Sequence, residues 1–275
     1  MRRIAALLLA LAAGPAAALV SITGNVNTSA PADDPGWANV GIFSNGEYTL
    51  VYLGGGWVLS AAHLVALPPA KTGSDVILGG VTYEWDHVPR EWIQTPPNVP
   101  YEPEGQGVDL ALWRIVGDPG LPSIPIASTS PAAGTEVVIV SYAQGRGAAY
   151  GPDGNGYHGW YRDSGARIKL WGTNKVRAAV PPYEGHGSYY TVFDHDPANQ
   201  TADEAQACGG DSGAVVFMKE NGVWVVSGIV VSGRFLVSLS TAVFGNETTI
   251  KDVGFYSRQI NRIMGHGAYN APWLR

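Results

Sequence analysis

The chain has 275 residues, of which 45% are hydrophobic and 15% charged, a composition that excludes both a disordered chain and an integral membrane protein. Its 36 glycines and 19 prolines leave few uninterrupted stretches for long helices and favour an all-β protein with many turns. The formal net charge of −6, without any run of basic residues, argues against nucleic acid or an anionic membrane surface as a partner.

Residues 1–18 have the layout of a secretory signal peptide. Arg2 and Arg3 precede an apolar run at 4–13, and the small residues at 16–18 suit cleavage after Ala18. The apolar run is too short to span a bilayer, although a buried N-terminal helix could look similar. We therefore expect an exported protein, extracellular or periplasmic, that has no membrane segment after cleavage.

Cys208 is the only cysteine in the chain. A disulfide within the chain is therefore excluded, and the exported protein has to be stabilised by its hydrophobic core alone. A mature chain of roughly 250 residues is long enough to bury such a core. This cysteine usage is more typical of a bacterial exported protein than of an animal one.

Ten short runs rich in β-forming residues lie between turn signals and predict strands. They are residues 48–53, 57–60, 75–78, 110–116, 136–142, 167–171, 189–193, 214–218, 223–232 and 235–240. A helical pattern is confined to 257–264, and no regular alternation of strands with helices indicates a parallel sheet. The fold class is therefore all-β, and the periodicity is compatible with a sandwich or a barrel.

Two stretches are predicted to be long irregular loops. Residues 89–107 are rich in proline and polar side chains, and residues 144–165 are rich in glycine. Loops of this length in a compact domain are usually functional or mobile. Prolines and small residues also cluster at 121–131, where a boundary would divide the mature chain into two all-β halves of similar size.

Three short motifs contain residues suited to nucleophilic catalysis. Ser212 lies between glycines in the run 209–213, where a turn can direct backbone N–H groups to one point. His63 follows an apolar strand and could act as a general base, and Asp109 could accept the second imidazole N–H. Taken singly, the serine motif could equally be a hairpin turn, while the histidine is more often a core or surface residue and the aspartate more often a turn or strand cap.

Together the motifs occur in the order His, Asp, Ser, and they resemble the signature blocks of the chymotrypsin/trypsin family of serine endopeptidases. The matching segments are 59–63 (LSAAH), 109–112 (DLAL) and 209–213 (GGDSG), with further similarity at 227–233 and 254–258. The resemblance covers roughly residues 22–264 and implies two six-stranded antiparallel β-barrels with a short C-terminal helix. It places His63 and Asp109 on the first barrel, 22–125, and Ser212 on the second, 126–275.

The resemblance also implies the role of each residue. His63 would take the proton of Ser212, Asp109 would stabilise the imidazolium, and the N–H groups of Gly210 and Ser212 would hold the oxyanion. Water would then hydrolyse the acyl-enzyme, and no step needs a metal or an organic cofactor. The expected partner is a protein or peptide substrate, bound by a monomer.

By the same resemblance, Gln206 forms the floor of the primary specificity pocket, and Gly233 and Gly254 form its walls. Because no acid lies at this floor, we expect uncharged residues, rather than Lys or Arg, before the cleaved bond. The chain departs from the family pattern at Cys208, where the family usually has a bridged cysteine. It departs again at 214–215, where Ala-Val replaces the common Gly-Pro.

Residues 19–21 are a candidate pro-segment of three residues, because the run that begins at Ile22 is similar to the start of mature family members. An ammonium freed at Ile22 could pair with Asp211 and so fix the oxyanion turn at Gly210. The alternative is that Ile22 is an ordinary linker residue and that side chains or water satisfy Asp211.

Secreted serine endopeptidase is the leading functional hypothesis, and a catalytically silent binding module on the same fold is its rival. All three triad positions are intact, which favours the enzyme. A serine esterase of the α/β-hydrolase type is disfavoured, because its elbow needs a glycine where this chain has Ala214. Its chain order, Ser then Asp then His, also differs.

Two groups of acidic residues resemble metal sites only weakly. Asp153 opens a segment like half of a calcium loop, but Ser164 lies where that loop needs a glutamate. His186 and the run 194–196, Asp-His-Asp, lack a regular ligand spacing. We therefore expect a plain turn and loop residues, respectively.

Overall fold

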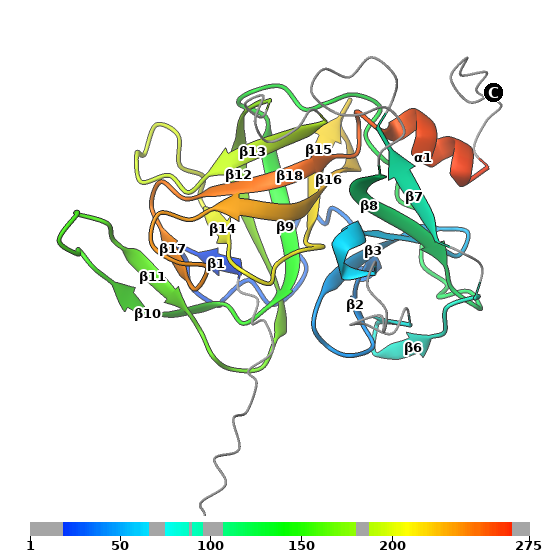
Figure 1. Cartoon of the computed structure of the whole chain (residues 1–275), viewed down its shortest axis with the longest axis horizontal. Coiled ribbons are helices and arrows are strands. Elements are labelled where there is room, and N and C mark those ends of the chain that lie inside the picture. Colours follow the sequence, from blue (N-terminus) through cyan, green and yellow to red (C-terminus); the bar gives the residue numbers. More distant parts are fainter. Residues whose placement is uncertain (1–18, 66–74, 88–89, 96–106, 180–186, 266–275) are drawn as a thin grey trace, which may run out of the picture.

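The structure is a computed structural model that describes residues 19–65, 75–87, 90–95, 107–179 and 187–265. The predicted signal peptide at 1–18, most of the predicted loop at 89–107 and His186 lie outside these residues. Within them the chain folds mainly into antiparallel strands, with one α-helix, α1 (Ser257–Ile263), near the C-terminal end (Figure 1). No helix in the described part is long and apolar enough to cross a membrane.

The first half of the chain forms a seven-stranded antiparallel sheet with the spatial order β6-β5-β2-β3-β4-β8-β7. Its strands are β2 (Val40–Phe43), β3 (Thr49–Gly54), β4 (Trp57–Ser60), β5 (Val76–Leu78), β6 (Val81–Tyr83), β7 (Glu91–Gln94) and β8 (Gly107–Arg114). The closed barrel predicted for this half is not confirmed. Ladders among the described residues leave β6 and β7 at the two ends of the sheet, and β6 is short and largely exposed.

The second half forms a closed barrel of six antiparallel strands, in the order β12-β13-β18-β16-β15-β9. The strands are β9 (Glu136–Ala143), β12 (Ile168–Ala179), β13 (Ser188–Val192), β15 (Val215–Glu220), β16 (Val223–Arg234) and β18 (Glu247–Asp252). Alternate apolar residues of these strands fill one buried cluster, which includes Val137, Ile139, Leu170, Val216, Val230 and Ile250. The all-β class and this barrel are confirmed.

Two predicted features of the second half are wrong. Residues 144–165 are not an irregular loop, because they contain the hairpin of β10 (Arg146–Tyr150) and β11 (Gly159–Arg162), which pairs with β17 (Thr241–Val243). Residues 235–240 are not a strand, because they form a turn-rich segment in which Val237 and Leu239 are exposed. The apolar residues of this segment face solvent and a neighbouring cavity instead of a sheet.

Residues 19–21 form a buried strand, β1 (Leu19–Ser21), that pairs antiparallel with β14 (Ala205–Ala207). Leu19 and Val20 are almost completely inaccessible to solvent, and Val20 lies opposite Gln206 in the register. Since β14 leads into the motif at 209–213, trimming of the chain at Ile22 would remove a buried neighbour of that motif.

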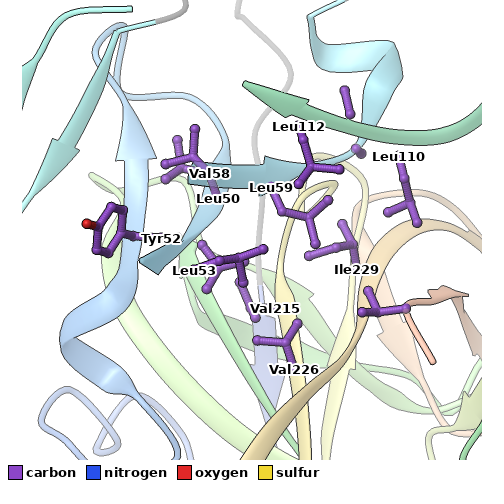
Figure 2. Packing of buried hydrophobic residues seen from close by; sticks show 14 of the residues in the cluster. Leu50, Tyr52, Leu53, Val58, Leu59, Leu110, Leu112, Val215, Val226 and Ile229 are labelled. Atoms are coloured by element: carbon purple, nitrogen blue, oxygen red, sulfur yellow. The ribbon is translucent and has the colours of Figure 1, made fainter. Parts of the chain in front are cut away.

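One hydrophobic cluster joins the two halves of the molecule. Figure 2 shows Leu59 of β4 and Leu112 of β8 beside apolar side chains of the second half, among them Val215 of β15 and Ile229 of β16. Burial of apolar surface on both sides fixes the halves against each other. The ends of β4 and β8 therefore keep a fixed position relative to the barrel.

A partly buried lysine also joins the halves. Lys169 of β12 donates hydrogen bonds to the carbonyl oxygens of Trp37, in the 3-10 helix η1 (Trp37–Asn39), and of Val40, the latter at 2.6 Å. Its ammonium also lies 4.6 Å from the centre of the Trp37 ring. Burial lowers the pKa of Lys169 from 10.5 to about 8, so the fold holds an ammonium at a desolvation cost.

The free energy of unfolding should therefore rise with pH between about 8 and 10.5. In this window the folded protein has released the Lys169 proton while the unfolded chain still binds it, and stability rises wherever the unfolded state binds more protons. Urea unfolding from about pH 7 to about pH 9.5 measures the slope. Lys169→Met should flatten the rise, and an unchanged slope in this variant would show that Lys169 is not its source.

Candidate active site

His63 and Asp109 are brought together by the pairing of β4 with β8. His63 lies directly after β4, in the 3-10 helix η2 (Ala62–Leu64), and Ser60 lies opposite Ala111 in the register. This register places Asp109 beside His63. The Nδ1 atom of His63 is 2.7 Å from Oδ2 of Asp109, and the His63 backbone N–H donates to Oδ1 at 2.8 Å.

The carboxylate of Asp109 contacts the imidazole of His63 through Oδ2, while Oδ1 holds the His63 backbone. Because a carboxylate only accepts hydrogen bonds, a neutral imidazole in this contact carries its proton on Nδ1 and has its lone pair on Nε2. The His63 side chain is 44% exposed and that of Asp109 is 28% exposed, so the outer face of the pair is open to a substrate. A histidine held in this way can act as a general base.

Ser212 lies in the turn between β14 and β15, and this turn packs directly against the first half of the molecule. A Cβ atom on Gly213 would lie 2.1 Å from the carbonyl oxygen of Thr49 and 2.6 Å from the Ser60 hydroxyl oxygen. Only glycine permits such an approach, and Gly213 also has a φ of +87°. The serine turn is therefore in contact with β4, the strand that leads into His63.

The turn before Ser212 has a defined backbone geometry. The Asp211 N–H donates to the carbonyl of Cys208 at 3.1 Å, and Gly210, third in this four-residue turn, has a φ of +96°. A positive φ at the third position is the mark of a type II turn and explains the glycine. Gly210, predicted to supply one oxyanion donor, lies in this turn, and Ser212, predicted to supply the other, follows it directly.

Asp211 is buried, and its carboxylate is satisfied inside the second half. Its oxygens accept from the hydroxyl of Ser141 at 3.1 Å and from the Cys208 N–H at 2.8 Å. Ile22, predicted to supply a pairing ammonium, is a chain residue here, and its N–H donates to the carbonyl of Glu204 at 2.9 Å. In a chain that still contains residues 19–21, Asp211 and Ile22 therefore have different hydrogen-bond partners.

A cavity of about 200 Å³ opens beside Ser212. Gly233 lines it, together with Cys208, Val230, Phe235 and Leu239. Phe235 and Leu239 were missed by sequence reasoning because the segment 235–240 was predicted to be a strand.

The other two residues predicted to form the primary pocket do not line this cavity. Gln206 is fully buried, and its side-chain amide donates to the carbonyl of Ala207 at 2.8 Å. A Cβ atom on Gly254 would lie 2.2 Å from the carbonyl oxygen of Thr129, so Gly254 packs against the chain that enters the second half. The cavity is instead lined by Cys208, Gly233 and their neighbours.

Cys208 is a free, buried cysteine at the wall of the cavity. Burial raises the pKa of its thiol above the ordinary range, since the thiolate would lose its hydration. The thiol stays protonated at neutral pH and so is not a nucleophile that competes with Ser212.

The acidic groups considered as metal ligands bind protein groups instead. Asp194 forms an ion pair with Arg177, and the Asp153 carboxylate accepts from the Tyr150 hydroxyl at 2.8 Å and from the backbone N–H of Tyr157 at 3.0 Å. Within the described ranges, no three His, Cys, Asp or Glu side chains gather as metal binding requires.

Comparison with known proteins agrees with this geometry. A family model described as a trypsin-like peptidase domain matches residues 41–229. Among solved structures, the chain is similar to neuropsin, a serine protease expressed in the limbic system of mouse brain, with a TM-score of 0.53 and 17% identity over 88% of this chain and 98% of that one. At this identity the likeness shows the fold. No curated protein matches the chain.

Proposed function

The chain belongs to the trypsin-like peptidase domain family, and on that premise we propose that it is a secreted serine endopeptidase. The observation that carries the proposal is the 2.7 Å contact between His63 Nδ1 and Asp109 Oδ2, beside a serine turn that packs on the strand leading to His63. The layout of residues 1–18 as a signal peptide supports secretion.

The reaction proceeds through an acyl-enzyme. The Ser212 hydroxyl oxygen attacks the peptide carbonyl carbon as its proton passes to Nε2 of His63, and Asp109 stabilises the imidazolium that forms. The N–H groups of Gly210 and Ser212 donate to the oxyanion; each such donor accelerates the reaction by about 10²- to 10³-fold. His63 then protonates the departing amine. Water, deprotonated by His63, cleaves the ester and restores the serine.

Labelling with a fluorophosphonate tests this proposal, since the probe reacts with a serine that a histidine activates. The purified protein should be labelled, and peptide mapping should place the label on Ser212. A catalytically silent binding module would bind peptides without reacting with the probe. Absence of label from folded protein would therefore reject the proposed enzyme.

The primary pocket should favour uncharged side chains at the residue before the cleaved bond. Its lining includes the apolar side chains of Val230, Phe235 and Leu239, and the Cys208 thiol is kept neutral by burial. An ammonium or guanidinium would lose its hydration there without gaining a carboxylate, so we expect about a 100-fold lower kcat/KM for Lys or Arg than for an apolar residue.

A peptide-library profile measures this preference. Phe235→Ala should enlarge the cavity and shift the preference toward longer apolar side chains. Phe255→Ala is the matched control, because the Phe255 ring is 40% exposed and lies outside the cavity. A wild-type profile dominated by Lys and Arg would overturn this view of the pocket.

A further inference from the structure

We infer that Arg162 is a positioning residue for the oxyanion hole, an inference that rests on the function proposed above. Its guanidinium holds the peptide group between Gly209 and Gly210 in the orientation that directs the Gly210 N–H toward the substrate. Arg162 lies at the end of β11, in a hairpin that is far from the three motifs in sequence.

The contact acts through the geometry of one peptide group. Nη1 of Arg162 donates to the carbonyl oxygen of Gly209 at 3.1 Å. In a planar trans peptide, this carbonyl and the N–H of Gly210 point in opposite directions. A donor that holds the Gly209 oxygen on one side therefore directs the Gly210 N–H to the other. Reversal of the peptide would place an acceptor where the oxyanion needs a donor.

The local sequence does not fix this orientation. Residues 209 and 210 are both glycine, and glycine adopts positive and negative φ with little difference in energy. Type I and type II turns differ in the orientation of their central peptide, and both contain the hydrogen bond observed from Asp211 N–H to Cys208. A contact from outside the turn has to select one of them, and Arg162 provides it.

The arginine is itself held firmly behind the turn. Its backbone N–H donates to the carbonyl of Ser240 at 3.0 Å, while the Gly209 N–H donates to the carbonyl of Leu239, the preceding residue, at 2.8 Å. Residues 239–240 thus hold the backbones of both Arg162 and Gly209, the two partners in the hydrogen bond. Arg167 adds a second, longer bond, from its Nη1 to the carbonyl of Gly210 at 3.4 Å.

This arrangement exists in a chain whose Ile22 is still linked to Ser21, and whose Asp211 carboxylate is satisfied by Ser141 and by the Cys208 N–H. The orientation of the Gly209–Gly210 peptide therefore does not depend on a new ammonium at Ile22.

Three variants test the inference. Arg162→Met removes the donors while it retains an unbranched apolar stem, Arg162→Lys retains a cationic donor, and Arg146→Met is the matched control. Arg146 lies opposite Arg162 in the hairpin register, but its guanidinium donates to the Ile22 carbonyl and lies over the Trp160 ring. A general effect of the charge or stability of the hairpin would therefore appear in both methionine variants.

Arg162→Met should lower kcat by about 10- to 100-fold, less than the loss of an oxyanion donor outright, because the peptide still visits the productive orientation. KM should change by less than about twofold, since ground-state binding does not use the hole. Arg162→Lys should recover most of the rate, and Arg146→Met should stay within about twofold of wild type.

A second measurement separates orientation of the hole from loss of structure. A peptide aldehyde forms a hemiacetal with the serine and places an oxygen in the hole, so its affinity should fall by the same factor as kcat/KM. The affinity of the amine product, the peptide on the leaving-group side, should not change, because it places no oxygen in the hole. Full kcat in Arg162→Met, or an equal loss of kcat in Arg146→Met, would overturn the role of Arg162 but leave the proposed function intact. A wild-type protein without labelling or hydrolysis would instead reject the proposed function.

Discussion

Ser212→Ala is expected to lower kcat for peptide hydrolysis by about 10⁶-fold, because the members of a nucleophilic triad act as a unit. Alanine has no oxygen to attack the carbonyl, and His63 then has no proton to accept. The oxyanion donors at Gly210 and at position 212 remain, so KM should change little and a slow residual hydrolysis should persist. Steady-state kinetics and fluorophosphonate labelling of the same preparation measure both effects.

Ser164→Ala is the matched control for this variant, since Ser164 is an exposed serine in the loop after β11. It should retain both activity and labelling. Fluorophosphonate label that persists on Ser212→Ala would show that another residue is the nucleophile.

Asp109→Asn is expected to lower kcat by about 10⁴-fold. In the native protein the two carboxylate oxygens accept from the backbone N–H and from Nδ1 of His63, at 2.8 and 2.7 Å. An asparagine has only one acceptor oxygen, so its NH₂ group must face either the backbone N–H or the ring. An NH₂ group that faces the ring moves the imidazole proton to Nε2, where it can no longer accept the serine proton.

The control for this variant is Asp118→Asn, because Asp118 is an exposed aspartate whose carboxylate accepts only a local backbone N–H in the described structure, that of Gly120 at 2.9 Å. Its kcat and KM should stay within about twofold of wild type. A loss below about tenfold in Asp109→Asn would show that Asp109 does not set the tautomer of His63.

The sequence predicts the elements around His63 and Asp109 well because local pattern determines them. Runs such as 57–60 and 110–116 are apolar, bounded by turn residues and long enough to be buried strands. The pairing of these two strands follows from the roles that His63 and Asp109 would have in a triad. The Ser212 turn is similarly predictable, since its glycines are needed for a positive φ and for close packing.

The hairpin of β10 and β11 could not be predicted in the same way. Its glycines suggest a loop, and it is stabilised by contacts that no local window contains. These are the contacts of the ladder with β17, far along the chain. Within the hairpin, Tyr150 adds edge-to-face packing on Tyr161, with ring centres 5.2 Å apart. For this reason, neither Arg162 nor the segment 235–240 was identified as part of the site.

The residues of the cavity beside Ser212 show a second limit to what the sequence predicts. The resemblance to the chymotrypsin/trypsin family predicts Gln206 at the pocket floor, but Gln206 is buried and does not line the cavity beside Ser212. Whether a side chain points into the cavity or away from it depends on the strand that covers it. Here β14 pairs with β1, and the Gln206 side chain is buried in the protein.

The pairing of β1 with β14 also sets an order for the folding of this region. The strand that leads into the Ser212 turn pairs with residues that lie far away in the sequence, and contacts of this kind carry a high cost of loop closure. Until residues 19–21 dock, this edge of β14 lacks its partner strand. We therefore expect the Ser212 turn to reach its final packing only after the segment that contains β1 is free to dock.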